Sequence, residues 1–128
     1  MIRAVKTVFG LILILTLVAC GGNKVDDSMA KKYVTKAEKI IHLLNEGNYK
    51  KVYAMFDDKM KTGLPVKDMK ELTPVIRESG DFKEIEKTSV KKKEGLYVTV
   101  LTAKYSDKNR VHTITFNDDM KVAGLYIK

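Results

Sequence analysis

The spacing of hydrophobic residues along this chain changes once, at Gly80, and this change limits the folds that the chain can adopt. Upstream of Gly80, apolar residues recur every three or four positions, the spacing of one face of an α-helix. Downstream, Val, Ile, Thr, Tyr and Phe gather in short runs separated by turn residues, which is the pattern of β-strands. Helices followed by strands predict a single α+β domain rather than a repeat of βαβ units.

Two amphipathic helices are expected in the first half of the chain. The first begins with Ser28 as its N-cap and ends before Gly47. The second is capped by Asn48 and continues to Met60, because its apolar residues fall within one narrow arc. Those residues are Tyr49, Val52, Tyr53, Phe56 and Met60.

A third helical segment, Val66 to Glu78, contains a proline at position 74. Proline is poorly tolerated inside a helix, so the segment is expected to break there. We interpret Thr73 as a cap and Pro74 as the first position of a new turn that ends at Gly80.

Four strands are expected after Gly80, and short turns between them predict an antiparallel meander. They are Phe82–Lys91, Leu96–Tyr105, Arg110–Phe116 and Lys121–Ile127. The second of these is apolar on both alternating faces and is expected to be covered on both sides. The predicted fold is a set of N-terminal helices packed on a curved, mainly antiparallel four-stranded sheet, a cystatin-like cone or roll.

The N-terminus has the three-part layout of a secretory signal. Arg3 and Lys6 precede an apolar run from Val8 to Leu17, which is shorter than the roughly 20 residues needed to span a bilayer. Leu17-Val18-Ala19-Cys20 resembles the lipobox of bacterial lipoproteins. The resemblance implies a diacylglyceryl group on Cys20, cleavage just before it, and a protein held on the outer face of the cell membrane. A soluble secreted protein and an uncleaved signal-anchor are the alternatives.

The chain is therefore expected to divide into three parts. Residues 1–19 form a signal peptide, residues 20–27 a lipidated cysteine with a flexible tether, and residues 28–128 one domain. Cys20 is the sole cysteine, so no disulfide can form within the chain. The formal charge is +8, and it is about +6 once the signal peptide with Arg3 and Lys6 is removed.

Several short motifs together resemble a bacterial domain of unknown function. They are Gly47-Asn48-Tyr49, Phe56-Asp57 with Met60, Gly80-Asp81-Phe82-Lys83, and the ending Lys121-Val122-Ala123-Gly124-Leu125-Tyr126-Ile127. That domain occurs in Gram-positive lipoproteins and ahead of α/β-hydrolase domains, and the resemblance covers roughly residues 30–128. It is similar to the cone-shaped superfamily of nuclear transport factor two and ketosteroid isomerase. This implies a bent sheet wrapped around helices, often with a pocket, and it implies no particular function.

The residues that could carry chemistry are few. His112 shares a strand face with Ile114 and Phe116, so it could act as a base or ligand contact on the concave side of the sheet. Tyr53, Tyr97 and Tyr105 could line the same pocket, although amphipathic core residues explain them equally well. A satisfied or partly exposed strand histidine is the favoured interpretation of His112, because no partner carboxylate is recognisable. No metal-ligand spacing, phosphate-binding loop or nucleophile motif occurs, and no cofactor is expected.

The positive net charge of the chain limits which classes of partner are expected. Nucleic acid is a poor partner for an exported chain whose cations are mainly lysine rather than arginine. Three hypotheses follow: a membrane-anchored, non-catalytic binding module; a small-molecule enzyme built around His112 that takes a small apolar ligand; and an electrostatic adaptor for an anionic envelope polymer. A solvated surface that only aids solubility is the simplest explanation of the lysines.

Overall fold

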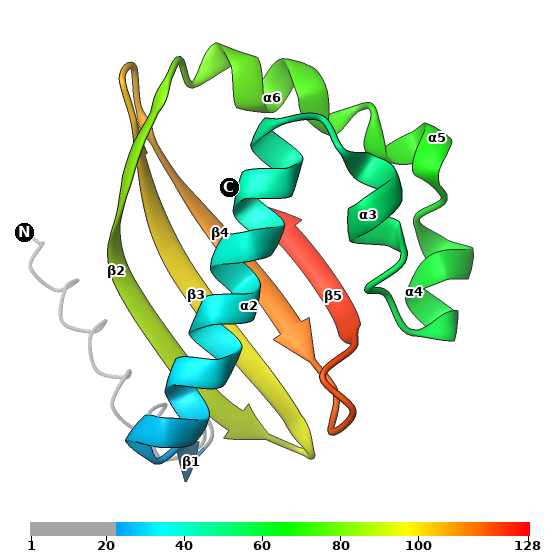
Figure 1. Cartoon of the computed structure of the whole chain (residues 1–128), viewed down its shortest axis with the longest axis vertical. Coiled ribbons are helices and arrows are strands. Elements are labelled where there is room, and N and C mark those ends of the chain that lie inside the picture. The colour runs from blue at the N-terminus through cyan, green and yellow to red at the C-terminus, as the bar shows by residue number, and fades with distance from the viewer. Residues whose placement is uncertain (1–22) are drawn as a thin grey trace, which may run out of the picture.

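The computed structural model describes residues 23–128, so the predicted signal peptide over residues 1–19 and Cys20 lie outside the described residues. Figure 1 shows helices lying across one face of a curved sheet. The elements are β1 (Asn23–Lys24), α2 (Asp27–Asn45), α3 (Tyr49–Tyr53), α4 (Asp58–Gly63), α5 (Val66–Met69), α6 (Leu72–Glu78), β2 (Phe82–Lys93), β3 (Leu96–Tyr105), β4 (Asn109–Phe116) and β5 (Val122–Ile127). The predicted α+β fold is confirmed.

The sheet is an antiparallel meander in the order β1-β2-β3-β4-β5. The four predicted strands are its long members, with bounds shifted by no more than two residues. A two-residue turn joins β2 to β3, and both of its residues, Glu94 and Gly95, have positive φ, at 51° and 81°. Such turns match the twist of the strands that they join, so they fix the register of the hairpin.

The first helix, α2, begins at an aspartate cap rather than at Ser28. The Asp26 carboxylate accepts the Met29 N–H at 3.0 Å, and this hydrogen bond lowers the pKa of Asp26. Ser28 lies inside the first turn and donates its hydroxyl to Asp26 at 3.0 Å. A carboxylate is the better partner for the free N–H groups at a helix start. Gly47, with φ at +76°, ends the helical segment as expected.

The second helix is not continuous, and the expectation of one helix to Met60 is wrong. The chain leaves α3 at Met55–Asp57 because that backbone pairs with the start of β5. The Asp57 N–H donates to the Val122 carbonyl, and the Val122 N–H donates to the Met55 carbonyl, both at 2.8 Å. Asp57 then caps α4 by accepting the Met60 N–H at 2.8 Å. Asn48 makes no side-chain capping bond to α3.

The third segment breaks as expected, but two residues earlier than predicted. It forms α5 and α6, and Glu71 rather than Thr73 is the residue before α6. Pro74 is the third residue of α6. Its missing N–H costs little there, because the first N–H groups of a helix have no carbonyl partner within it.

The core lies between α2 and the concave face of the sheet (Figure 1). Leu101 and Ala103 of β3 are fully buried on that face, whereas Val98 and Val100 on the opposite face are only half-buried. The expectation that β3 is covered on both sides is therefore wrong, because the helices lie on one face only. The apolar second face reflects the preference of β-branched residues for strands.

The domain begins earlier than Ser28. Asn23 and Lys24 form β1 and pair with Lys92 and Lys91 of β2. Residues 23–27, which the sequence assigns to a flexible tether, thus form a strand, a capping turn and the first residue of α2.

Candidate functional site

The concave side of the sheet, where the sequence suggests a pocket, is filled by the protein itself. His112 points to this side and is 0% exposed. Neither imidazole nitrogen has a hydrogen-bond partner among the described residues. Burial, and to a smaller degree the positive charge of Arg110, lowers the pKa of His112 to about 4. A neutral, enclosed imidazole with no partner carboxylate has neither the access nor the proton relay that a general base needs.

The structure does not bring the three candidate tyrosines together with His112. Tyr97 stacks on Tyr33 of α2 with a 4.3 Å separation of ring centres, near the start of β3. Tyr105 is the last residue of the same strand and donates its hydroxyl to Asn45 at 2.6 Å. Tyr53 is the last residue of α3, and its ring centre lies 5.8 Å from that of Phe56 in the segment between α3 and α4. Of the three, only Tyr105 lines a cavity described below.

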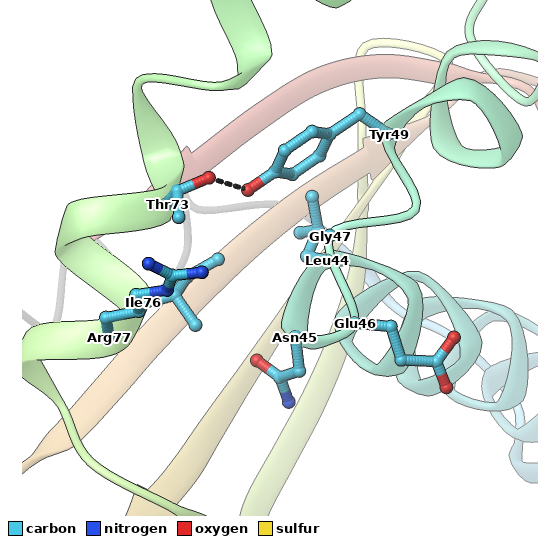
Figure 2. A pocket seen from close by; sticks show the side chains of 8 residues that line it. All are labelled: Leu44, Asn45, Glu46, Gly47, Tyr49, Thr73, Ile76 and Arg77. Carbon is cyan, nitrogen blue, oxygen red and sulfur yellow. Dashed lines mark hydrogen bonds between the residues drawn. The ribbon is translucent and has the colours of Figure 1, made fainter.

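A polar cleft, which we call the Asn45 cleft, opens instead where the C-terminal end of α2 faces α6. Two hollows, of about 80 Å³ and 300 Å³, share Asn45, Ile76 and Arg77 in their walls. Figure 2 shows Asn45 across the opening from Ile76 and Arg77. The smaller hollow is completed by Leu44, Glu46, Gly47, Tyr49 and Thr73, and the larger one by Gly80, Asp81, Phe82 and Tyr105.

Asn45 is the polar centre of this cleft. The Tyr105 hydroxyl satisfies its side-chain oxygen, but the amide nitrogen is buried and has no partner among the described residues. Whichever way the amide is turned, one of its two polar atoms faces Tyr105 and the other stays unpaired. An unpaired buried amide group costs about 1–3 kcal/mol, so it is a preferred contact for a ligand atom that can pair with it.

The walls of the cleft are held by hydrogen bonds between elements. Tyr49 of α3 and Thr73 of α6 share a hydrogen bond between their hydroxyls (Figure 2). Arg110 of β4 reaches α6, where its Nε donates to the Ser79 hydroxyl at 2.7 Å and its terminal nitrogen donates to the Val75 carbonyl at 3.2 Å. Three elements far apart in sequence therefore position the two sides of the opening.

Arg77 places a positive charge at the rim of the cleft. Its side chain is exposed, and no ion pair to it is formed within residues 23–128. Asp81 and Glu46 place carboxylates at the two ends of the cleft. The lining of the cleft thus combines an unpaired buried amide with one cation and two carboxylates at its rim.

The sequence did not indicate this cleft. Asn45 belongs to α2 but lies beside its apolar stripe, and the sequence pattern predicts for Arg110 only the first position of a strand. One feature of the sequence could have pointed to Asn45. Asparagine is a weak helix former, and Asn45 occupies a helical position next to the buried Leu44. Its partner Tyr105 is 60 residues away, so no local pattern could have linked them.

A second unusual surface is the outer side of α2. Lys31, Lys32, Lys36 and Lys39 line a shallow hollow of about 550 Å³ together with Ser28, Thr35 and Met120. A neighbouring hollow of about 500 Å³ shares Lys36 and Lys39 and adds Leu43, Lys51, Ala54 and Met55. We call the five lysines of these two hollows the lysine crest.

Within residues 23–128, no helix is both long enough and apolar enough to cross a bilayer. In the same part of the chain, no three His, Cys, Asp or Glu side chains are grouped so that they could hold a metal ion.

Comparison with known proteins identifies the family. No curated protein and no solved structure matches the chain. A family model described as "Protein of unknown function (DUF3887)" matches residues 37–125, a range that includes the C-terminal part of α2, the cleft, β2 to β4 and most of β5. The motifs quoted above for a domain of unknown function all lie within this range, apart from the last two residues of the final motif. The chain therefore belongs to the DUF3887 family.

Proposed function

We propose that this protein is a lipid-anchored, extracytoplasmic binding module that acts without catalysis, with its ligand site in the Asn45 cleft. The observation that carries the anchor is the lipobox-like sequence that ends at Cys20, three residues before β1. A folded domain that starts so close to a lipidated cysteine would be held directly at the membrane surface. The proposal extends to the fold, which we assign to the cone-shaped superfamily of nuclear transport factor two.

The filled concave face supports a binding role over catalysis. An enzyme of the proposed superfamily would need an accessible base in that face, and His112 is enclosed there without a partner. The three candidate tyrosines contact other elements instead.

The ligand proposed for the cleft is a small molecule with a carboxylate. One carboxylate oxygen would accept the Asn45 amide N–H, and the negative charge would face Arg77. The larger hollow, of about 300 Å³, is at the lower end of the range typical of small-molecule sites.

The anchor is tested by expressing the full chain in a Gram-positive host and comparing Cys20→Ser with Ser28→Ala. We expect wild type and Ser28→Ala to carry a diacylglyceryl mass on Cys20 and to remain with the membrane after a high-salt wash. Cys20→Ser should lack that mass. An unmodified Cys20 in the wild-type chain would overturn the anchor.

The cleft is tested by titrating the protein with acetate and following the NMR signals of Asn45, Ile76 and Arg77. We expect saturable shifts for acetate and weaker shifts for acetamide, which lacks the charge. Arg77→Gln should weaken the acetate response, whereas Lys67→Gln, which removes an exposed positive charge on α5 outside the cleft, is a control with the same change in charge. Equal responses to the two probes, or shifts spread over the whole surface, would reject a carboxylate site.

A further inference from the structure

The lysine crest carries more positive charge than its surroundings neutralise. No acidic residue lines either of its two hollows. Among the described residues, none of its five lysines forms an ion pair, whereas Lys108 and Arg110 both lie within 4 Å of Glu78. Asp118 and Asp119 precede Met120 in the turn between β4 and β5, and Asp27 precedes Ser28 at the start of α2, so acidic residues border the crest at that end. Like charges three or four positions apart on a helix repel one another, so this arrangement favours an anionic partner.

The floor beneath these charges is apolar. Met120 closes one hollow, and Leu43, Ala54 and Met55 close the other. Lys36 is partly buried along its length, while Lys31, Lys32, Lys39 and Lys51 are exposed. Lysine stems that cover apolar surface while their ammonium groups extend outward are typical of side chains at a membrane interface.

We propose that the lysine crest rests on the anionic lipid surface of the membrane that holds Cys20. This inference depends on the proposed anchor for its geometry but uses different residues. The ammonium groups contact lipid phosphates, and Met120 and the lysine stems face the boundary between headgroups and acyl chains. The docked domain then lies with α2 along the membrane and the Asn45 cleft at the far end of that helix.

The position of β1 keeps the folded domain close to the proposed lipid anchor at Cys20. Asn23 is paired with Lys92, so only three peptide units separate it from Cys20 and span at most about 11 Å. That length is close to the Debye length of about 8 Å at physiological salt, within which charged lipids attract lysines. With 19 residues, α2 is about 28 Å long, so the crest reaches the surface only if the helix lies roughly parallel to it.

The test is a lysine footprint of the lipidated full chain in vesicles. The chain is reconstituted in phosphatidylcholine alone or in phosphatidylcholine with phosphatidylglycerol, and acetylation by a water-soluble reagent is measured at each lysine by mass spectrometry. We expect acetylation of Lys36 and Lys39 to slow severalfold in the anionic vesicles and to recover in high salt. Lys67 and Lys70, exposed at α5, should react equally in both. Equal reactivity of the crest lysines in the two kinds of vesicle would overturn the proposal.

Charge reversal supplies matched variants. Lys36→Glu/Lys39→Glu should abolish the lipid-dependent protection at Lys31 and Lys32, and Lys67→Glu/Lys70→Glu, with the same change in net charge, should leave it intact. Equal loss in both variants would show that only net charge matters and would reject a specific face.

The Cys20→Ser chain separates this inference from the anchor. Its binding to anionic vesicles is measured by flotation. Salt-sensitive binding that Lys36→Glu/Lys39→Glu weakens about tenfold or more supports the crest even if Cys20 carries no lipid. If the lipidated chain floats with vesicles but its crest is never protected, the anchor stands and the docking surface is rejected. Protection by soluble polyphosphate alone, without any by anionic vesicles, would also reject it and would favour an envelope polymer.

Discussion

The two ends of α2 are packed in opposite ways. Near its start, Tyr33 stacks on Tyr97 and lies 5.4 Å from the ring of Phe116, in a cluster of buried aromatic rings. At its end, Asn45 and Tyr105 share a hydrogen bond beside two hollows, and one amide group is unpaired. The aromatic end holds the helix on the sheet, whereas the polar end forgoes tight packing and leaves room for a ligand. Under the proposed function, one helix serves stability at its first end and binding at its second.

The largest effect is expected at the aromatic end. Phe116→Ala should lower the free energy of unfolding by about 3–5 kcal/mol, because Phe116 is fully buried and its ring contacts cannot be replaced. Urea denaturation followed by circular dichroism measures the change. A loss below about 1 kcal/mol would mean that this end is not tightly packed, and the contrast between the two ends would disappear.

The next effect concerns His112, the polar residue inside the apolar core. Its pKa falls from 6.5 to about 4 on folding, so the unfolded chain binds a proton that the folded chain excludes. Stability should therefore decline as pH drops from about 6.5 to 4, by up to about 3 kcal/mol from this group, and the contribution should level off below pH 4.

His112→Leu should remove that part of the pH dependence and be at least as stable as wild type near pH 4. Denaturation of both proteins at several pH values measures the difference, in which the contributions of other groups cancel. Parallel stability curves for the two proteins between pH 4 and 6.5 would contradict an unpaired, buried imidazole.

A smaller effect is expected at the polar end. Tyr105→Phe should cost about 1 kcal/mol, because it removes the hydroxyl that satisfies Asn45. The double variant Asn45→Leu/Tyr105→Phe should lose less stability than the sum of the two single variants, since no unpaired amide remains. Strictly additive losses in a double-mutant cycle would indicate that the two side chains do not interact.

The smallest effect is expected outside both ends. Tyr126 lies on β5 and is 62% exposed, so Tyr126→Ser should change stability by no more than about 0.5 kcal/mol. The same denaturation assay applies. A loss comparable to that of Phe116→Ala would indicate that the outer face of the sheet is covered in solution, for example by a second chain.

The fold was predictable where the signals are local. The alternation after Gly80 and the turn at Glu94 and Gly95 predicted the strands to within two residues. The break between α3 and α4 was not predictable, because the chain leaves the helix to pair Phe56 with Val122, 66 positions later. The Asn45 cleft was not predictable for the same reason, since its walls meet only through contacts between residues far apart in sequence. His112 was expected to be a satisfied or partly exposed strand histidine, but it is fully buried and neither ring nitrogen has a partner among the described residues. That enclosure depends on how α2 packs on the sheet, which no local pattern predicts.

Pairing of β1 with β2 also affects how neighbouring molecules meet. With the proposed anchor, chains are concentrated in two dimensions, where an exposed strand edge can pair with the edge of a neighbouring sheet. β1 covers one end of the β2 edge, and the remainder carries Lys83, Glu84, Glu86 and Lys87 with two register irregularities. At the opposite border, Phe56 covers the start of β5. The sheet thus presents little regular edge for polymerisation, and crowded copies can remain separate.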